Sequence, residues 1–306
     1  MKLSARKLAG KALSVFWDPI EKERDLHRCE GMDTDTVKSV CLILGPYRNL
    51  TTLTASVLFL HPQCQVLNHG SRRIFGDDRI DFIKDYSEAR YARFVRYALC
   101  ASENGRRGSH GGSITRSHAV VDRPDMLQAM EQLGPKDAPT ALVWKESLRT
   151  ANHLRACGID PGNLLKDNSQ LRFLLPIRHP IDCATSNVRT GHVRVFEGLD
   201  RSTTVEDALA AVVKEIAWFR RLQRQHPHRF HHYFGYDAPA PVLHGLAGFL
   251  DLDAPEQWLR AGTQAFQVGA QYEHSQALVD CYRNLVGETF TDDPEFSQGL
   301  LAFVSA

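Results

Sequence analysis

VKSVCLILGPYRNLTTLTASVLFLHP, residues 37–62, is the stretch that decides the fold class. Its first part, residues 37–44, is a short apolar and β-branched run that ends at Gly45-Pro46, which is typical of a buried parallel strand. Its last part, residues 51–60, has helical spacing and ends at His61-Pro62. A strand, a tight loop and a helix within about 25 residues predict a βα unit.

Other apolar runs predict further strands, and the segments between them predict helices. The strands are expected at residues 64–67, 141–144, 171–177 and, at an edge of the sheet, 230–234. The helices are expected at residues 79–100, 147–156, from about 181 onwards, 205–225 and 242–250. Residues 103–117 are rich in Gly, Ser and Arg without apolar periodicity, and they predict an exposed loop.

Strands that alternate with helices favour a single α/β domain. We predict a three-layer architecture in which a central parallel sheet of about four to five strands is covered by helices on both faces. Residues 36–306 are expected to form this domain, and residues 1–35 an N-terminal extension.

The composition argues against several classes of function. The 37 Lys and Arg residues nearly balance the 36 Asp and Glu residues, so a formal charge of +1 gives no field that would attract nucleic acid or an anionic membrane. No window approaches the roughly 20 apolar residues of a membrane span, and Gly10 and Lys11 interrupt the only signal-like segment. The seven cysteines lack paired spacing, which favours reduced thiols in a cytoplasmic protein; homo-oligomers are compatible with this.

The loop after the first strand, residues 45–53, has features of a phosphate-binding site. Arg48 precedes Thr51 and Thr52, which fall at a helix N-terminus, where unpaired N–H groups and the helix dipole favour an anion. Arg48 can also bind anionic oxygens in a bidentate fork. The alternative is that Thr51 only caps the helix and Arg48 is solvated.

A second candidate site, residues 178–186, follows the strand predicted at residues 171–177. Pro180 suits the first turn of a helix, which places Arg178 at the carboxyl end of the strand and Ser186 about two turns into the helix. Because ligands of open α/β sheets bind at these strand ends, Arg178 and Ser186 are expected to bind a second phosphate, some distance from the first.

Together the two stretches resemble the motifs of the sulfotransferase family. The second matches the family pattern Arg-x-Pro-x-Asp with a Ser eight residues after the Arg, through Arg178, Pro180, Asp182 and Ser186. The first is similar to the family's 5′-phosphosulfate loop, a basic residue followed by Ser-Gly-Thr-Thr, with Asn49 and Leu50 in place of Ser-Gly. The resemblance extends over residues 37–259 and includes His61-Pro62 and the segments 144–147 and 233–237.

The resemblance implies a P-loop NTPase-like fold and the transfer of a sulfonate group from PAPS to a hydroxyl or amine, which leaves PAP. Arg48 would then stabilise the leaving group, and Arg178 and Ser186 would bind the 3′-phosphate. The 5′-phosphate would lie on the first loop, at Arg48, Asn49, Leu50, Thr51 and Thr52. A carbohydrate or another small molecule is the expected acceptor, and its identity stays open.

A general base is expected beside the strand ends. We rank His69 first, because it follows the strand at residues 64–67 and a neutral imidazole suits proton transfer near pH 7, and we rank Glu146 second and His118 third. Lys145 and His118 are expected to contact the substrates. No metal is predicted, because alternation along a strand separates the histidines of the one rich cluster, His226, His228, His231 and His232.

Two other functions stay open. One is a small-molecule kinase on the same fold, which the missing Gly-Lys pair of a G-x-x-x-x-G-K-[ST] loop disfavours. The other is a catalytically degenerate protein that binds PAPS or PAP, which is motivated by Leu50 and by the undecided base.

Overall fold

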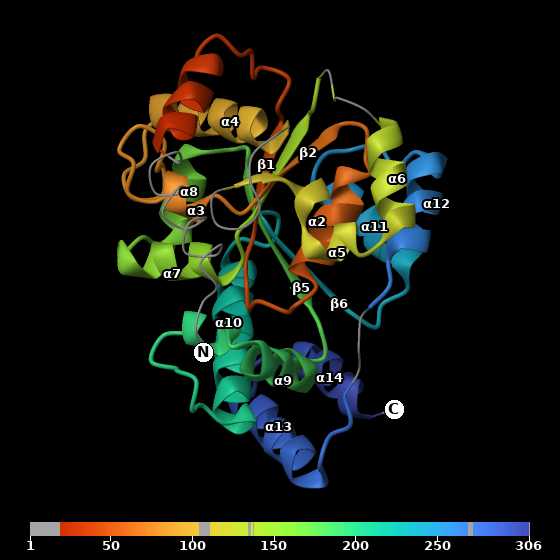
Figure 1. The fold of residues 1–306 in the computed structure, drawn as a ribbon. Helices are drawn as coiled ribbons and strands as arrows, with labels where there is room; N and C mark the ends of the chain where they lie inside the picture. Colours follow the sequence, from red (N-terminus) through yellow and green to blue (C-terminus); the bar gives the residue numbers. More distant parts are fainter. Residues whose placement is uncertain (1–18, 104–110, 134–135, 137, 269–271, 306) are drawn as a thin grey trace, which may run out of the picture.

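A six-stranded sheet forms the centre of the protein (Figure 1). The computed structural model describes residues 19–103, 111–133, 136, 138–268 and 272–305. The strands lie in the order β3-β2-β4-β1-β5-β6, and all neighbours are parallel except β3, which is antiparallel to β2. Their bounds are β1 Ser39–Ile43, β2 Cys64–Asn68, β3 Gly112–Ser113, β4 Ala141–Lys145, β5 Leu171–Ile177 and β6 Phe230–Phe234.

Helices cover both faces of this sheet. In Figure 1, α2, α6, α11 and α12 lie on one side, and α4, α7 and α8 lie on the other. Besides the helical residues 19–28, the helices are α2 Thr51–Phe59, α3 Ser71–Ile74, α4 Glu88–Glu103, α5 His118–Val121, α6 Pro124–Leu133, α7 Leu148–Ala156, α8 Pro161–Asp167, α9 Pro180–Thr190, α10 Val205–Gln225, α11 Pro239–Phe249, α12 Glu256–Ala265, α13 Gln276–Thr289 and α14 Pro294–Leu301. Short 3₁₀ turns follow at Ile114–Arg116, His192–Val195 and Ala302–Val304.

Alternation along β1 divides the core into two halves. Val40 and Leu42 pack into the core on the α4 side, whereas Cys41 and Ile43 pack into the core on the α2 side. All five residues of β1 are buried, as expected for a parallel strand with helices on both faces. The three-layer α/β class is therefore confirmed, and β1 lies at the centre of the sheet between β4 and β5.

The parallel part of the sheet has five strands, in agreement with the expected four to five, and one antiparallel strand at its edge was not predicted. The sixth strand, β3, lies within the segment 103–117 that had been expected to be a loop, and it pairs with Leu67 and Asn68 of β2. It is close to β2 because Gly111 has no side chain: a Cβ added there would lie 2.9 Å from the Cα of Gly70. Backbone pairing at an edge needs no apolar side chains, so the hydrophobic pattern did not reveal this strand.

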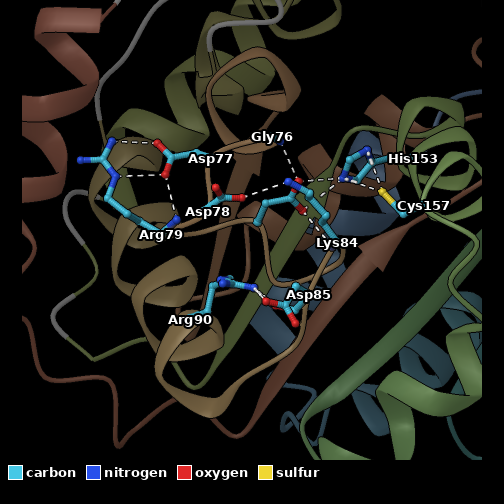
Figure 2. A network of polar contacts seen from close by, with 10 residues as sticks. Gly76, Asp77, Asp78, Arg79, Lys84, Asp85, Arg90, His153 and Cys157 are labelled. Atoms are coloured by element: carbon cyan, nitrogen blue, oxygen red, sulfur yellow. Dashed lines mark hydrogen bonds and ion pairs between the residues drawn. The ribbon is translucent and has the colours of Figure 1, made fainter.

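The helix expected at residues 79–100 was also too long. Helix α4 begins only at Glu88, and the preceding residues form turns. Two carboxylates accept hydrogen bonds from backbone N–H groups in these turns. Asp81 accepts from Gly76 N at 2.7 Å and from Lys84 N at 3.2 Å, and Asp77 accepts from Arg79 N at 2.9 Å. Figure 2 shows this polar network, in which side chains replace the bonds that a helix would make.

The N-terminal region is partly outside the described residues. Residues 1–18 lie outside them, and residues 19–28 are helical. Leu26 and Cys29 are buried in the core on the α4 side, and Arg73 of α3 pairs with Glu21 at 2.8 Å and with Asp25 at 3.5 Å. Among all described helices, none has the length and apolar character needed to cross a bilayer.

Candidate functional site

A pocket of about 640 Å³ opens at the carboxyl ends of β1, β2, β4 and β5. In parallel α/β sheets this edge is where ligands bind, because loops and helix N-termini converge there. The side chains around the pocket include Arg48, Thr52, His69, Lys145, Arg178 and His192, and none of the described residues that line it is Asp or Glu. The pocket is therefore suited to an anion.

The loop between β1 and α2 adopts an unusual backbone conformation. Arg48 and Leu50 have φ values of 64° and 61°, in the left-handed region that favours glycine. Leu50 directly precedes α2 and provides no side-chain cap, so the first N–H groups of this helix have no side-chain acceptor from it. Thr51 is buried, and its Oγ1 accepts a hydrogen bond from the Ser147 hydroxyl at 2.9 Å.

Asn49 holds this loop against the end of β5. Its side chain is fully buried, donates from Nδ2 to the Pro176 carbonyl at 2.6 Å and accepts from the Arg178 N–H at 2.8 Å. Both the nitrogen and the oxygen of this side-chain amide thus make structural hydrogen bonds. Asn49 had been expected among the donor-binding residues, and the structure gives its side chain the role of a clamp between the two loops.

Arg48 of the first stretch lies beside Arg178 and Ser186 of the second. Arg48 Nε donates to Ser186 Oγ at 2.9 Å, and Arg178 Nη1 approaches the Arg48 carbonyl at 3.5 Å. Arg178 is also paired with Asp182, with 3.5 Å between Nη2 and Oδ2. The two stretches identified in the sequence therefore form one continuous polar surface.

His69, Lys145 and Glu146 form a second group on the β2 and β4 side of the pocket. His69 Nε2 lies 3.3 Å from Lys145 Nζ, and His69 Nδ1 lies 3.6 Å from Glu146 Oε1. Glu146 is fully buried and accepts a hydrogen bond from Ser71 N at 3.0 Å, which fixes the position of its carboxylate. The imidazole thus lies between a carboxylate and an ammonium group.

Burial shifts the titration of two groups in this cluster. Burial lowers the pKa of His69, and the Lys145 ammonium lowers it further, whereas Glu146 opposes the change. Burial also lowers the pKa of Lys145, to about 8, against the effect of Glu146. Near pH 7 the site therefore has a neutral imidazole beside a lysine that gives up its proton more readily than usual.

Backbone strain is concentrated at the same edge of the sheet. Among the described residues, five other than glycine have positive φ values: Arg48, Leu50, His69, Ser147 and Asp251. Four of these lie in the segments that follow β1, β2 and β4, and three of the four, Arg48, Leu50 and His69, line the pocket. Such conformations cost about 1–3 kcal/mol each and persist where the surrounding structure enforces them, which is typical of functional sites.

The remaining expected residues have less direct evidence. Thr52 is half-buried in the first turn of α2 and lines the pocket. His118 begins α5, and its side chain lies outside the described residues. In the histidine-rich segment, His231 stacks on Phe249 and His232 packs edge-on against Phe234 and Phe296.

Several lining residues had not been predicted from the sequence, among them Tyr47, His192, Arg123 and Gln267. The ring of His192 lies 5.4 Å from that of Tyr47, and burial together with the Arg48 charge lowers the pKa of His192. Gly191, the left-handed C-cap of α9, marks in the sequence where the chain turns toward the pocket. Arg123 and Gln267 lie in loops, before α6 and after α12, and have no local signal.

Comparisons with known proteins identify distant similarities in structure alone. No protein-family model matches the chain, and no curated protein matches it. Mouse sulfotransferase SULT7A1 complexed with PAP is similar over 92% of this chain and 93% of its own, with 9% identity and a TM-score of 0.44.

Two further solved structures are similar. The sulfotransferase domain of the Synechococcus PCC 7002 olefin synthase has 14% identity and a TM-score of 0.38, with 76% of this chain and 80% of that one covered. Retinol dehydratase in complex with androsterone and inactive cofactor PAP has 13% identity and a TM-score of 0.39, with coverages of 89% and 85%.

Proposed function

We propose that this chain is a sulfotransferase that transfers a sulfonate group from PAPS to a hydroxyl or amine of a carbohydrate or another small molecule. The observation that carries the proposal is the meeting of Arg48, Arg178 and Lys145 in one pocket, beside a neutral His69, with no carboxylate among the lining residues in the described part of the chain. Three cations without lining acids suit a ligand with several phosphate or sulfate groups.

The donor fits the residues present. Arg178 and Ser186 would bind the 3′-phosphate, since the Arg48–Ser186 hydrogen bond and the Arg178–Arg48 contact bring these polar groups together. The 5′-phosphate would lie at the N-terminus of α2, where Thr51, Thr52 and the first backbone N–H groups face the pocket. Leu50 takes the backbone conformation that a glycine would adopt without strain, so the loop keeps its shape at an energetic cost.

His69 is the proposed general base. Its Nε2 would take the proton of the acceptor hydroxyl while the acceptor oxygen bonds to sulfur and the bond from sulfur to the phosphate oxygen breaks. Glu146 is a positioning residue: at 3.6 Å from Nδ1 it favours the tautomer that carries its proton there. Lys145 and Arg48 would stabilise the negative charge that develops on the leaving phosphate.

The cysteines support a reducing compartment. All seven are free thiols, and five of them are buried. We therefore place the protein in the cytoplasm, where structural thiols stay reduced.

Calorimetry with adenosine 3′,5′-bisphosphate tests the donor site. The wild-type chain should bind this bisphosphate at least tenfold more tightly than 5′-AMP, because a second phosphate adds charge-assisted hydrogen bonds. Ser186→Ala should lower the ratio of these two affinities. Ser297→Ala, which removes a distant hydroxyl on α14, should leave the ratio unchanged. Equal affinity for the two nucleotides, or stabilisation by Mg-ATP alone, would reverse the proposal in favour of a kinase.

Turnover separates an enzyme from a degenerate binding protein. With PAPS as donor, transfer of labelled sulfonate to a panel of sugars, phenols and amines should produce at least one labelled product. Tight bisphosphate binding with no product from any acceptor would indicate that the chain only binds the nucleotide.

A further inference from the structure

Two histidines and a carboxylate meet behind the Arg178 side of the site. One ligand atom each of His179, Asp182 and His274 lies within 4.8 Å of the other two. His179 and Asp182 belong to the start of α9, and His274 comes from the segment before α13. These residues do not line the pocket described above.

The hydrogen bonds of the His179 ring suit a metal ligand. Its Nδ1 is buried and has no hydrogen-bond partner among the described residues. The ring also makes a hydrogen bond to the backbone of Phe303, and because Nδ1 makes none, this bond involves Nε2. Histidines that bind metals commonly donate the second ring N–H to a backbone carbonyl in this way. Nδ1 of His179 is therefore available to a metal.

Asp182 and His274 are already aligned with each other. Asp182 is almost fully buried, and its Oδ1 lies 2.9 Å from His274 Nε2 and accepts from Tyr272 N at 3.1 Å. A carboxylate has about four acceptor positions, so these contacts leave room for a further one. The ring of His274 lies 5.0 Å from that of His179, which brings the third ligand to the same point.

Aromatic rings surround the group. The centres of the Phe303 and Tyr282 rings lie 5.4 Å and 6.5 Å from that of His179, and Tyr282 is fully buried. The side chain of His274 is only 11% exposed. A partly dry shell of this kind strengthens bonds between a metal and its ligands, because water competes less.

We propose that His179 Nδ1, Asp182 and His274 Nε2 form a site for a divalent transition metal of the zinc type. Two imidazoles and one carboxylate are the ligand set of many zinc sites, in which water or a substrate oxygen takes the fourth position. The metal would link the start of α9 to the segment before α13 and, through Phe303, to the C-terminal turn Ala302–Val304.

The charge of Arg178 opposes the metal and makes a linked effect testable. Arg178 Nη2 lies 3.5 Å from Asp182 Oδ2, so the metal would bind beside a guanidinium as well as at a helix N-terminus, and both are positive. A phosphate on Arg178 would reduce that repulsion. Zinc affinity should therefore rise several-fold when the bisphosphate is present, and by linkage the bisphosphate should bind more tightly with zinc; this arm rests on the proposed function.

Zinc alone tests the site without reference to the nucleotide. Calorimetric titration of the full chain with Zn²⁺ should give about one bound ion per chain, and Co²⁺ should give the visible absorption of a tetrahedral site. His274→Gln can still hydrogen-bond to Asp182 but is a poor ligand, so it should weaken zinc binding by on the order of 100-fold or more. His179→Ala should do the same, and the exposed His228→Ala should bind zinc like the wild type.

Circular dichroism and thermal unfolding should show that His274→Gln is folded. If this folded variant binds zinc as tightly as the wild type, or if the wild type shows no saturable binding, the three residues are only a hydrogen-bonded latch and the metal site is overturned. Failure of the bisphosphate to bind would leave the Zn²⁺ titration in its absence fully interpretable, so the two proposals fail separately.

Discussion

The loop after β1 and the loop after β5 both connect a buried parallel strand to a helix, yet they are held in different ways. The first has left-handed backbone at Arg48 and Leu50, and its shape depends on the Asn49 clamp. The second begins α9 with Pro180 at its first turn, a position that suits proline, and holds its arginine through Asp182. The Asn49 hydrogen bonds hold the strained first loop, and charge pairing holds the second.

This difference assigns different tasks to the two sides of the pocket. The first loop lies with Lys145 and His69, the groups whose pKa values are lowered by burial. The second provides Arg178, which is almost fully buried. We therefore expect changes at His69 to affect turnover, changes at Leu50 to affect backbone strain, and changes at Arg178 to affect nucleotide affinity. Lys145 should affect nucleotide affinity through its charge.

The largest effect is expected for His69→Ala. Loss of the general base should lower kcat by roughly 1,000-fold, while the Kd of the bisphosphate changes little. Steady-state kinetics and calorimetry measure the two quantities, and His244→Ala on the exposed face of α11 is the control. If His69→Ala retains more than a tenth of the wild-type kcat, proton removal depends on another group.

Arg178→Ala should instead weaken bisphosphate binding more than it lowers kcat. Removing a buried, charge-assisted partner of a phosphate costs about 2–3 kcal/mol, or roughly 100-fold in bisphosphate affinity. The exposed Arg221→Ala on α10 should have no effect. An Arg178→Ala chain that is folded and binds the bisphosphate normally would contradict the task assigned to the second loop.

The next effect concerns pH. Burial lowers the pKa of Lys145 to about 8, so above that pH the free site loses a positive charge and bisphosphate affinity should fall by up to tenfold per pH unit. Lys145→Met should remove this dependence. An affinity that stays constant from pH 7 to 9 in the wild type would mean that Lys145 does not contact the nucleotide.

Stability should respond to Lys145 in the opposite sense. Between about pH 8 and its ordinary pKa of 10.5, Lys145 binds fewer protons in the folded chain than in the unfolded chain. Its contribution therefore makes the folded state more stable as pH rises through this window. Urea unfolding of the wild type and of Lys145→Met at several pH values measures the difference.

The smallest effect isolates backbone strain at Leu50. Leu50→Gly should be more stable than Leu50→Ala by about 1 kcal/mol, because both variants lose the leucine side chain but only glycine relieves the left-handed strain. At Leu53, within α2, the order should be reversed, with Ala more stable than Gly by about 1 kcal/mol. Urea unfolding of the four variants measures these stabilities. If the Gly and Ala variants have the same order of stability at both positions, the prediction of left-handed strain at Leu50 is wrong.

Much of the fold could be read from the sequence because it depends on local patterns. Continuous apolar runs identified β1, β2, β4 and β5, and Phe230–Phe234 was correctly expected at an edge as β6. The pattern failed where polar side chains or backbone pairing decide the structure, at Asp77 and Asp81 before α4 and at the glycines beside β3.

The sequence by itself determined which strand ends carry the arginine and hydroxyl side chains of the candidate site, since Arg48, Arg178 and Ser186 stand next to strands that are recognisable one by one. Only the tertiary structure decided that Arg48 reaches Ser186, that Glu146 and Lys145 flank His69, and that His274 meets Asp182. The reason is physical: these contacts join residues that are distant along the chain, and their distances follow from sheet order and burial, which no local pattern records.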